Sequence, residues 1–214
     1  RSEDKVIFVE GYFDVISPHQ AGFKNVVATS GTALTEEHMR FIKRYTKNVL
    51  FVFDSDIAGK AATLRAVEIA VKNAVRPSIV SLGEFKDPDE ACKQAKFGEC
   101  LSAAKYYLDY YIDELATRLS ADGGPISSEK KLHICEEFFA VLKFTDEDIE
   151  IKDYLEKLSF SLHVELQVLL DKFAKFKREQ ARLKRGDADE GAISAEKPLK
   201  FAPIDYFFGF LISF

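Results

Sequence analysis

The sequence predicts an α/β fold, with a parallel-sheet domain over residues 1–102 and a small all-α helical bundle over 103–176. Two patterns lead to this prediction. In the first region, short apolar runs alternate with helix-forming segments, which is typical of a parallel sheet with helical crossovers. After Leu101 the strand pattern stops, and apolar residues recur at the three- and four-residue spacing of helices.

Four apolar runs are the expected strands. The runs at 6–9 and 49–53 are continuous, as in strands that are buried on both faces of a sheet. Two further runs lie at 26–29 and 78–82. Helices are expected between the strands, over 14–20, over 35–45 with Thr35 as N-cap, and over 58–74.

The second region is expected to hold four helices. Apolar residues recur at helical spacing within 108–119, 132–142, 154–158 and 164–173. Thr145 and Asp148 resemble a capping box that opens the third helix. Residues 177–203 are charged and lack an apolar period, so we expect a linker there. Residues 204–214 are apolar again, and we expect them to begin a further, truncated domain.

Composition narrows the class of protein. Of the 214 residues 47% are hydrophobic, which is enough for a buried core, and the net charge is −5. A nucleic-acid enzyme usually has a basic surface, so the acidic balance fits a chain that holds cations or lacks a basic partner segment. The three cysteines have no CxxC spacing, which indicates a reducing compartment and no zinc site. No apolar stretch is long enough to cross a bilayer, so we expect no membrane contact.

Acidic residues follow three of the four expected strands. Glu10 comes directly after the first, Asp54 and Asp56 after the third, and Asp87 and Asp89 after the fourth. The carboxyl ends of parallel strands lie at one edge of a sheet, so these side chains should converge. Clustered carboxylates repel one another unless a cation neutralises them, and oxygen ligands suit Mg²⁺ or Mn²⁺. The pattern predicts a metal site for phosphate chemistry, where two ions can act on one displacement.

Most of these acids also have a purely structural interpretation. Asp87 fits the N-cap of a helix with Pro88 at its first position, and Asp56 can cap the helix over 58–74. Asp14, one helical turn after Glu10, is either a supporting acid of the metal site or a favourable first-turn charge. Glu10 is harder to explain in this way, because a carboxylate beside a buried strand is costly to desolvate without a partner.

Four stretches resemble the Toprim domain of bacterial DnaG-type DNA primases. They are residues 9–15, 31–35, 53–59 and 86–90. The runs at 19–23 and 31–35 are similar to primases in particular. The resemblance covers residues 4–100 and extends more weakly to 176, so it implies a Toprim-type parallel-sheet domain followed by the helical bundle.

The resemblance implies a site and a reaction. Glu10, Asp54 and Asp56 would be the catalytic residues and would bind Mg²⁺ or Mn²⁺ together with Asp87 and Asp89. Asp14 would support this acidic site. The implied reaction is the DNA-directed synthesis of short RNA primers from ribonucleoside triphosphates on single-stranded DNA. It would take place in the bacterial cytoplasm, at the replisome.

The sequence also departs from the family. Ser55 and Ile57 stand where many primases have glycine and arginine, so a phosphate contact is lost although the carboxylates are kept. We expect zinc only in an N-terminal module that this sequence lacks, together with the basic part of the polymerase core, so the isolated chain should be weak or inactive. The replicative helicase would bind a C-terminal domain of which 204–214 is the start. A fragment of another Toprim nuclease or topoisomerase, or an inactive interaction fragment, are the alternative interpretations.

Overall fold

The computed structural model describes residues 4–29, 33–53, 57–121 and 126–190 of the chain. The chain divides into two compact units, Arg1–Ala174 and Lys175–Phe214. The sheet and the pockets discussed below all lie within the first unit.

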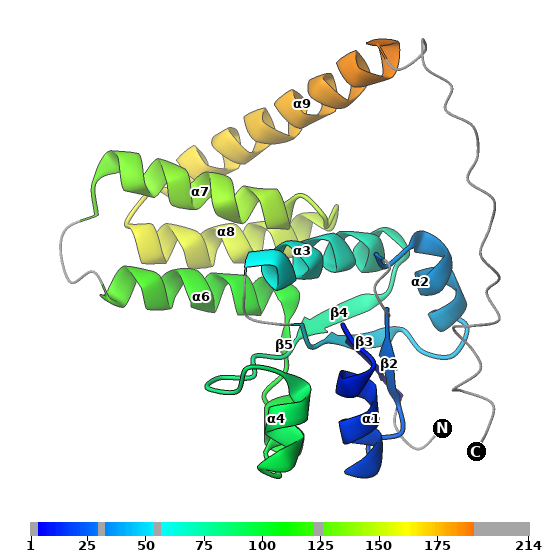
Figure 1. Ribbon diagram of the computed structural model, residues 1–214. Helices are drawn as coiled ribbons and strands as arrows, with labels where there is room; N and C mark the ends of the chain where they lie inside the picture. The colour runs from blue at the N-terminus through cyan, green and yellow to red at the C-terminus, as the bar shows by residue number, and fades with distance from the viewer. Residues whose placement is uncertain (1–3, 30–32, 54–56, 122–125, 191–214) are drawn as a thin grey trace. The chain divides into compact units, whose positions relative to one another are not determined.

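A five-stranded sheet, in the order β2-β1-β3-β4-β5, is formed by the described residues of the first unit (Figure 1). Four strands run parallel to their neighbours: β1 (Val6–Val9), β2 (Val26–Ala28), β3 (Asn48–Phe51) and β4 (Arg76–Ile79). The predicted parallel sheet is confirmed, although β4 begins before the expected run at 78–82. Strand β5 (Lys105–Tyr106) is antiparallel to β4 and was not expected, because two residues are too short for a recognisable pattern.

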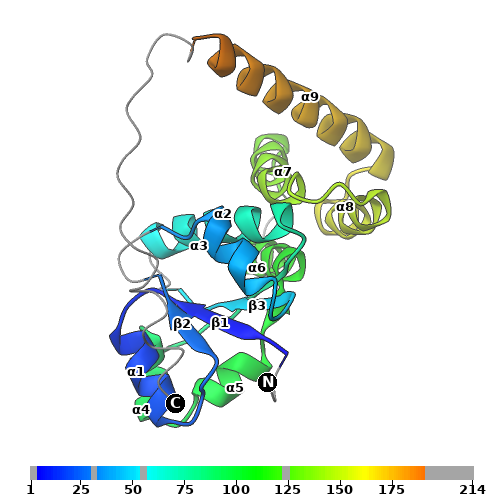
Figure 2. The same ribbon diagram turned by 90° about the vertical axis from the view of Figure 1, so that its right-hand side faces the viewer.

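Helices cover both faces of the sheet (Figure 2). One face carries α1 (Phe13–Gln20), α4 (Pro88–Lys93) and α5 (Phe97–Ser102). The other face carries α2 (Glu36–Ile42), α3 (Ile57–Lys72) and α6 (Tyr107–Ala121). Side chains along a strand alternate between the two faces of the sheet. Ile7 and Val9 pack with Phe97 in the core between the sheet and the helices α1 and α4, and Phe8 therefore points to the opposite face.

Local signals set the start of α2 and the end of α1, although α2 ends at Ile42, before the expected residue 45. Thr35 is the N-cap of α2, where its hydroxyl accepts a hydrogen bond from the backbone N–H of His38 at 3.2 Å. Helix α1 ends just before Gly22, whose φ of +99° is a left-handed conformation that glycine adopts without strain. These ends fix where each crossover turns back toward the sheet.

The bundle consists of α6, α7 (Ser128–Leu142), α8 (Asp148–Leu162) and the first part of α9 (Leu166–Glu190). The hydroxyl of Tyr154 on α8 donates to Asp109 on α6 at 2.7 Å, which joins two of these helices. The expected capping box of Thr145 and Asp148 is wrong. Helix α8 follows Glu147, and the Thr145 hydroxyl accepts a hydrogen bond from the backbone N–H of Glu147 at 3.2 Å, which forms a local turn instead.

Helix α9 continues to Glu190, past residue 177 where we expected a linker to begin. Residues in this stretch have no apolar period, but most are strong helix formers, and Lys175 lies 3.8 Å from Glu179 in an i,i+4 pair. An exposed helix does not need the apolar stripe on which the linker prediction depended. Residues 204–214 lie outside the described part of the chain, and the boundaries 1–102 and 103–176 stay predictions. None of the described helices is long and apolar enough to span a membrane.

Candidate functional site

The strand ends that precede two of the acidic stretches lie side by side. Strands β1 and β3 are parallel neighbours, with Phe8 opposite Phe51, and the backbone N–H of Val52 donates to the carbonyl of Phe8 at 2.9 Å. Glu10 directly follows β1, and Phe53 is the last described residue after β3. Asp54 and Asp56 come next in the sequence and lie outside the described residues.

Asp14 closes the turn after β1. Its Oδ2 accepts a hydrogen bond from the backbone N–H of Gly11 at 3.0 Å. A Cβ at position 11 would lie 3.1 Å from the same oxygen, so glycine gives the carboxylate room to approach the backbone. Asp14 is therefore more than a first-turn charge of α1, because it orders the backbone directly after Glu10.

Asp87 is the N-cap of α4. Its Oδ1 accepts from the backbone N–H of Glu90 at 2.8 Å, and Pro88 occupies the first turn. The Glu90 carboxylate in turn accepts from the backbone N–H of Lys86 at 2.8 Å. The capping interpretation of Asp87 is confirmed, and this role fixes the start of the helix that also carries Asp89.

Asp89 joins α4 to α1. Its Oδ1 accepts from the hydroxyl of Ser17, and its Oδ2 lies 2.6 Å from Nζ of Lys93. The hydrogen bond from Lys93, and to a lesser extent the one from Ser17, holds the pKa of Asp89 below its usual value. Ser17 and Asp14 are three residues apart on α1 and share one face of that helix. The contact between Asp89 and Ser17 thus brings the segment after β4 to the face of α1 that carries Asp14.

We did not predict the two partners of Asp89 from the sequence, although one of them could have been found there. Lys93 stands four residues later on the same helix, a spacing that is visible in the sequence. Ser17 is 72 residues away, and no local pattern links a serine on one crossover helix to an acid on another. Only the packing of α1 against α4 brings these two residues together.

The donor set is made of oxygen ligands. Carboxylates such as Glu10, Asp14 and Asp89 are the ligands that Mg²⁺ and Mn²⁺ prefer. Burial, and to a lesser extent the charge of Asp89, raises the pKa of the nearby Cys92 thiol to about 11, so this thiol is protonated at neutral pH. Among the described residues, to which Asp54 and Asp56 do not belong, no three His, Cys, Asp or Glu side chains are grouped as a metal site.

Known proteins resemble this chain in both sequence and fold. Residues 7–92 match a family described as Toprim-like. A DNA primase of Clostridium acetobutylicum is 32% identical over 171 residues, which cover 78% of this chain and 28% of the relative. A DNA primase of Borreliella burgdorferi is 30% identical over 184 residues, which cover 83% of this chain and 34% of the relative.

A solved structure agrees with these relatives. The crystal structure of the Aquifex aeolicus primase, with its zinc-binding and RNA polymerase domains, matches with a TM-score of 0.61 and 27% identity, and the match covers 80% of this chain and 40% of that one. The chain spans about a third of the length of these two DNA primases. It thus carries a Toprim-like domain and is a relative of the bacterial DnaG-type DNA primases.

Proposed function

We propose that the chain is the metal-binding part of a bacterial DNA primase, an enzyme that synthesises short RNA primers on single-stranded DNA. The observation that carries the proposal is the adjacency of β1 and β3, because Glu10 follows one strand and the sequence Asp54-Ser55-Asp56 closely follows the other. The similarity to DNA primases at 30% and 32% identity supports it.

Glu10, Asp54 and Asp56 are the proposed catalytic ligands of Mg²⁺ or Mn²⁺, and Asp87 and Asp89 are further ligands. When bound, the ions neutralise the charge on the phosphate oxygens that take part in the transfer. One of the two partners of Asp89 is Lys93, whose side chain is 73% exposed. Because an exposed ion pair contributes little to stability, a metal ion can replace Lys93 beside Asp89 at a small cost in free energy. Asp14 supports the site by holding the Gly11 backbone beside Glu10.

The proposed reaction is a nucleotidyl transfer. The 3′ hydroxyl of the growing primer forms a bond to the α-phosphorus of a ribonucleoside triphosphate, and the bond to pyrophosphate breaks. The substrates are ribonucleoside triphosphates, and the partners are the single-stranded DNA template, the RNA primer and the replicative helicase of the cytoplasmic replisome. We assign the helicase contact, and any zinc, to other parts of the longer protein.

Binding of Mn²⁺ tests the metal site directly. Titration calorimetry would compare the chain with an Asp54→Ala, Asp56→Ala double variant, which we expect to bind Mn²⁺ at least tenfold more weakly. The matched control is the double variant Asp153→Ala, Glu156→Ala, which removes two exposed carboxylates from α8 and should bind Mn²⁺ as tightly as the parent. Equal affinity in the parent and in the first double variant would disprove the assignment.

Primer synthesis tests the reaction. Contacts between basic side chains and phosphates dominate affinity for nucleic acids. Because the net charge of the chain is −5, we expect these 214 residues alone to bind the template weakly and to synthesise little RNA. In the longer protein, Asp54→Ala should abolish the synthesis of RNA on single-stranded DNA, and Asp153→Ala should leave it intact. A longer protein that makes primers equally well with Asp54→Ala would contradict the proposed function.

A further inference from the structure

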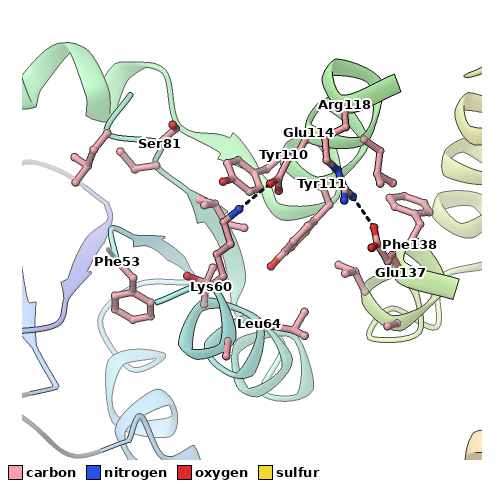
Figure 3. A pocket seen from close by; sticks show the side chains of 18 of the residues that line it. Phe53, Lys60, Leu64, Ser81, Tyr110, Tyr111, Glu114, Arg118, Glu137 and Phe138 are labelled. Carbon is pink, nitrogen blue, oxygen red and sulfur yellow. Dashed lines mark hydrogen bonds and ion pairs between the residues drawn. The ribbon is translucent and has the colours of Figure 1, made fainter. Parts of the chain in front are cut away.

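A cleft of about 490 Å³ lies beside the carboxyl end of β4 (Figure 3), and no residue of α1 or α4 lines it. Its walls come from the start of α3, the segment after β4, and helices α6 and α7. Four aromatic side chains line it: Phe53, Tyr110, Tyr111 and Phe138. This volume is within the range of sites for small ligands, roughly 300–1,000 Å³, and such sites combine apolar walls with a few polar groups.

The charges in the cleft cancel. Nζ of Lys60 lies 3.2 Å from Oε1 of Glu114, and Nη2 of Arg118 lies 2.5 Å from Oε2 of Glu137. Two cations are therefore matched by two anions. A phosphate group that approached either cation would be repelled by the carboxylate paired with that cation, whereas a neutral ligand meets no net charge.

The tyrosines offer both ring surfaces and hydroxyl groups. The rings of Tyr110 and Tyr111 are 5.5 Å apart and nearly perpendicular, at 87°. Tyr111 points from α6 into the space between α6 and α3, and Tyr110 points toward the segment that carries Ser81 (Figure 3). Burial raises the pKa of both phenols, so their hydroxyls are neutral donors.

We propose that this cleft binds a neutral, planar aromatic heterocycle about the size of a nucleoside, which stacks on Tyr111 and is hydrogen-bonded by Tyr110 and Ser81. Planar rings stack on aromatic side chains with a gain of about 1–3 kcal/mol, and a polar edge satisfies the hydroxyls. The site is distinct from the acidic residues of the proposed transfer and takes no part in that reaction.

Ligand-detected NMR on the whole chain tests the proposal, with adenosine, quinolin-2-one and AMP as probes. We expect adenosine and quinolin-2-one to bind with dissociation constants of about 1 mM or below, a weak free energy of about −4 kcal/mol that suits such small probes. AMP should bind at least fivefold more weakly than adenosine. Nuclear Overhauser effects from the probes to the tyrosine ring protons locate the site without any variant.

A filled cleft provides the control. Ala61→Trp places a large ring in the cleft wall from an exposed position of α3, and Ala181→Trp makes the same change on the exposed surface of α9. We expect Ala61→Trp to weaken adenosine at least tenfold and Ala181→Trp to have no effect, with circular dichroism confirming that both fold. Ala140→Leu, from the opposite wall, replaces Ala61→Trp if that variant unfolds. Tighter binding of AMP, absence of saturable adenosine binding, or binding that survives the filled cleft would each overturn the proposal.

Discussion

The two sides of the sheet's carboxyl edge differ in how their charged side chains are partnered. On the side of α1 and α4, Asp14 and Asp89 come from separate segments of the chain, and they are held by a backbone N–H, a hydroxyl and an exposed lysine. On the side of α3 and α6, each cation is matched by its own carboxylate, as in the pair of Lys60 and Glu114. The two sides differ because the helices that cover them carry different side chains, and we propose cations as the ligands of one side and uncharged molecules as the ligands of the other.

The largest expected effect comes from the core beneath the acidic side. Phe97 is 1% exposed and packs edge-on against Phe23, with ring centroids 5.2 Å apart. Phe97→Ala should lower the free energy of unfolding by about 3–5 kcal/mol, measured by urea denaturation. Phe160→Ala, at a site that is 82% exposed, should change it by less than about 0.5 kcal/mol. If both variants were equally stable, the packing around Phe97 would not stabilise the side of the sheet that carries the acidic residues, which would contradict this prediction.

Neutralising a single carboxylate should remove most of the cleft's preference for adenosine over AMP. Glu114→Gln leaves Lys60 without its anionic partner, so AMP should gain about five- to tenfold in affinity relative to adenosine. The control is Glu68→Gln, which breaks the 2.8 Å pair with Lys72 on the same helix α3 and should not alter either probe. An unchanged ratio of the two affinities would show that charge cancellation does not set the preference.

On the acidic side, two substitutions of Asp14 distinguish whether this residue acts by holding the backbone or through its charge. Asp14→Ala removes the acceptor of the Gly11 N–H and should weaken Mn²⁺ binding by about threefold to tenfold, which corresponds to the net contribution of one hydrogen bond, about 0.5–1.5 kcal/mol. Asp14→Asn keeps an oxygen acceptor and should retain most of the affinity. Titration calorimetry measures both, with Asp153→Asn as the control. If the asparagine variant bound as weakly as the alanine variant, Asp14 would act through its charge instead.

The smallest expected effect is a change in the titration of Asp89. Its pKa is held below the usual value, so the ionised form stabilises the fold above the unfolded-state pKa, and this contribution is lost as the pH falls through the folded-state pKa. In Lys93→Met the pKa of Asp89 should rise toward its unfolded-state value, so the loss of stability in acid that is due to Asp89 should be smaller and should be complete at a higher pH. Carboxyl NMR measures the shift, and Lys96→Met, which breaks the 2.7 Å pair with Glu99, is the control. A pKa of Asp89 that does not move would refute this assignment to Lys93.

The sequence predicted the features that depend on short-range signals. The buried runs of β1 and β3 and the N-caps Thr35 and Asp87 are written in a few consecutive residues, and the structure confirms them. Features that depend on packing were not predicted. The contact between Ser17 and Asp89 and the pairs that line the cleft join residues far apart in the chain, and β5 exists only because β4 offers an edge.

Phe53 belongs to both sides of the edge. It lines the cleft, its ring centroid lies 5.6 Å from that of Phe51, and Phe51 lies 5.7 Å from Phe8 on β1. The next residue in the sequence is Asp54. An inhibitor that competes for the acidic residues must resemble a metal chelate or a polyphosphate, and such compounds cross cell envelopes poorly. An uncharged compound that displaced Phe53 from the cleft would shift the residue that precedes Asp54, and would thereby act on the proposed metal site without the charge of a metal chelate.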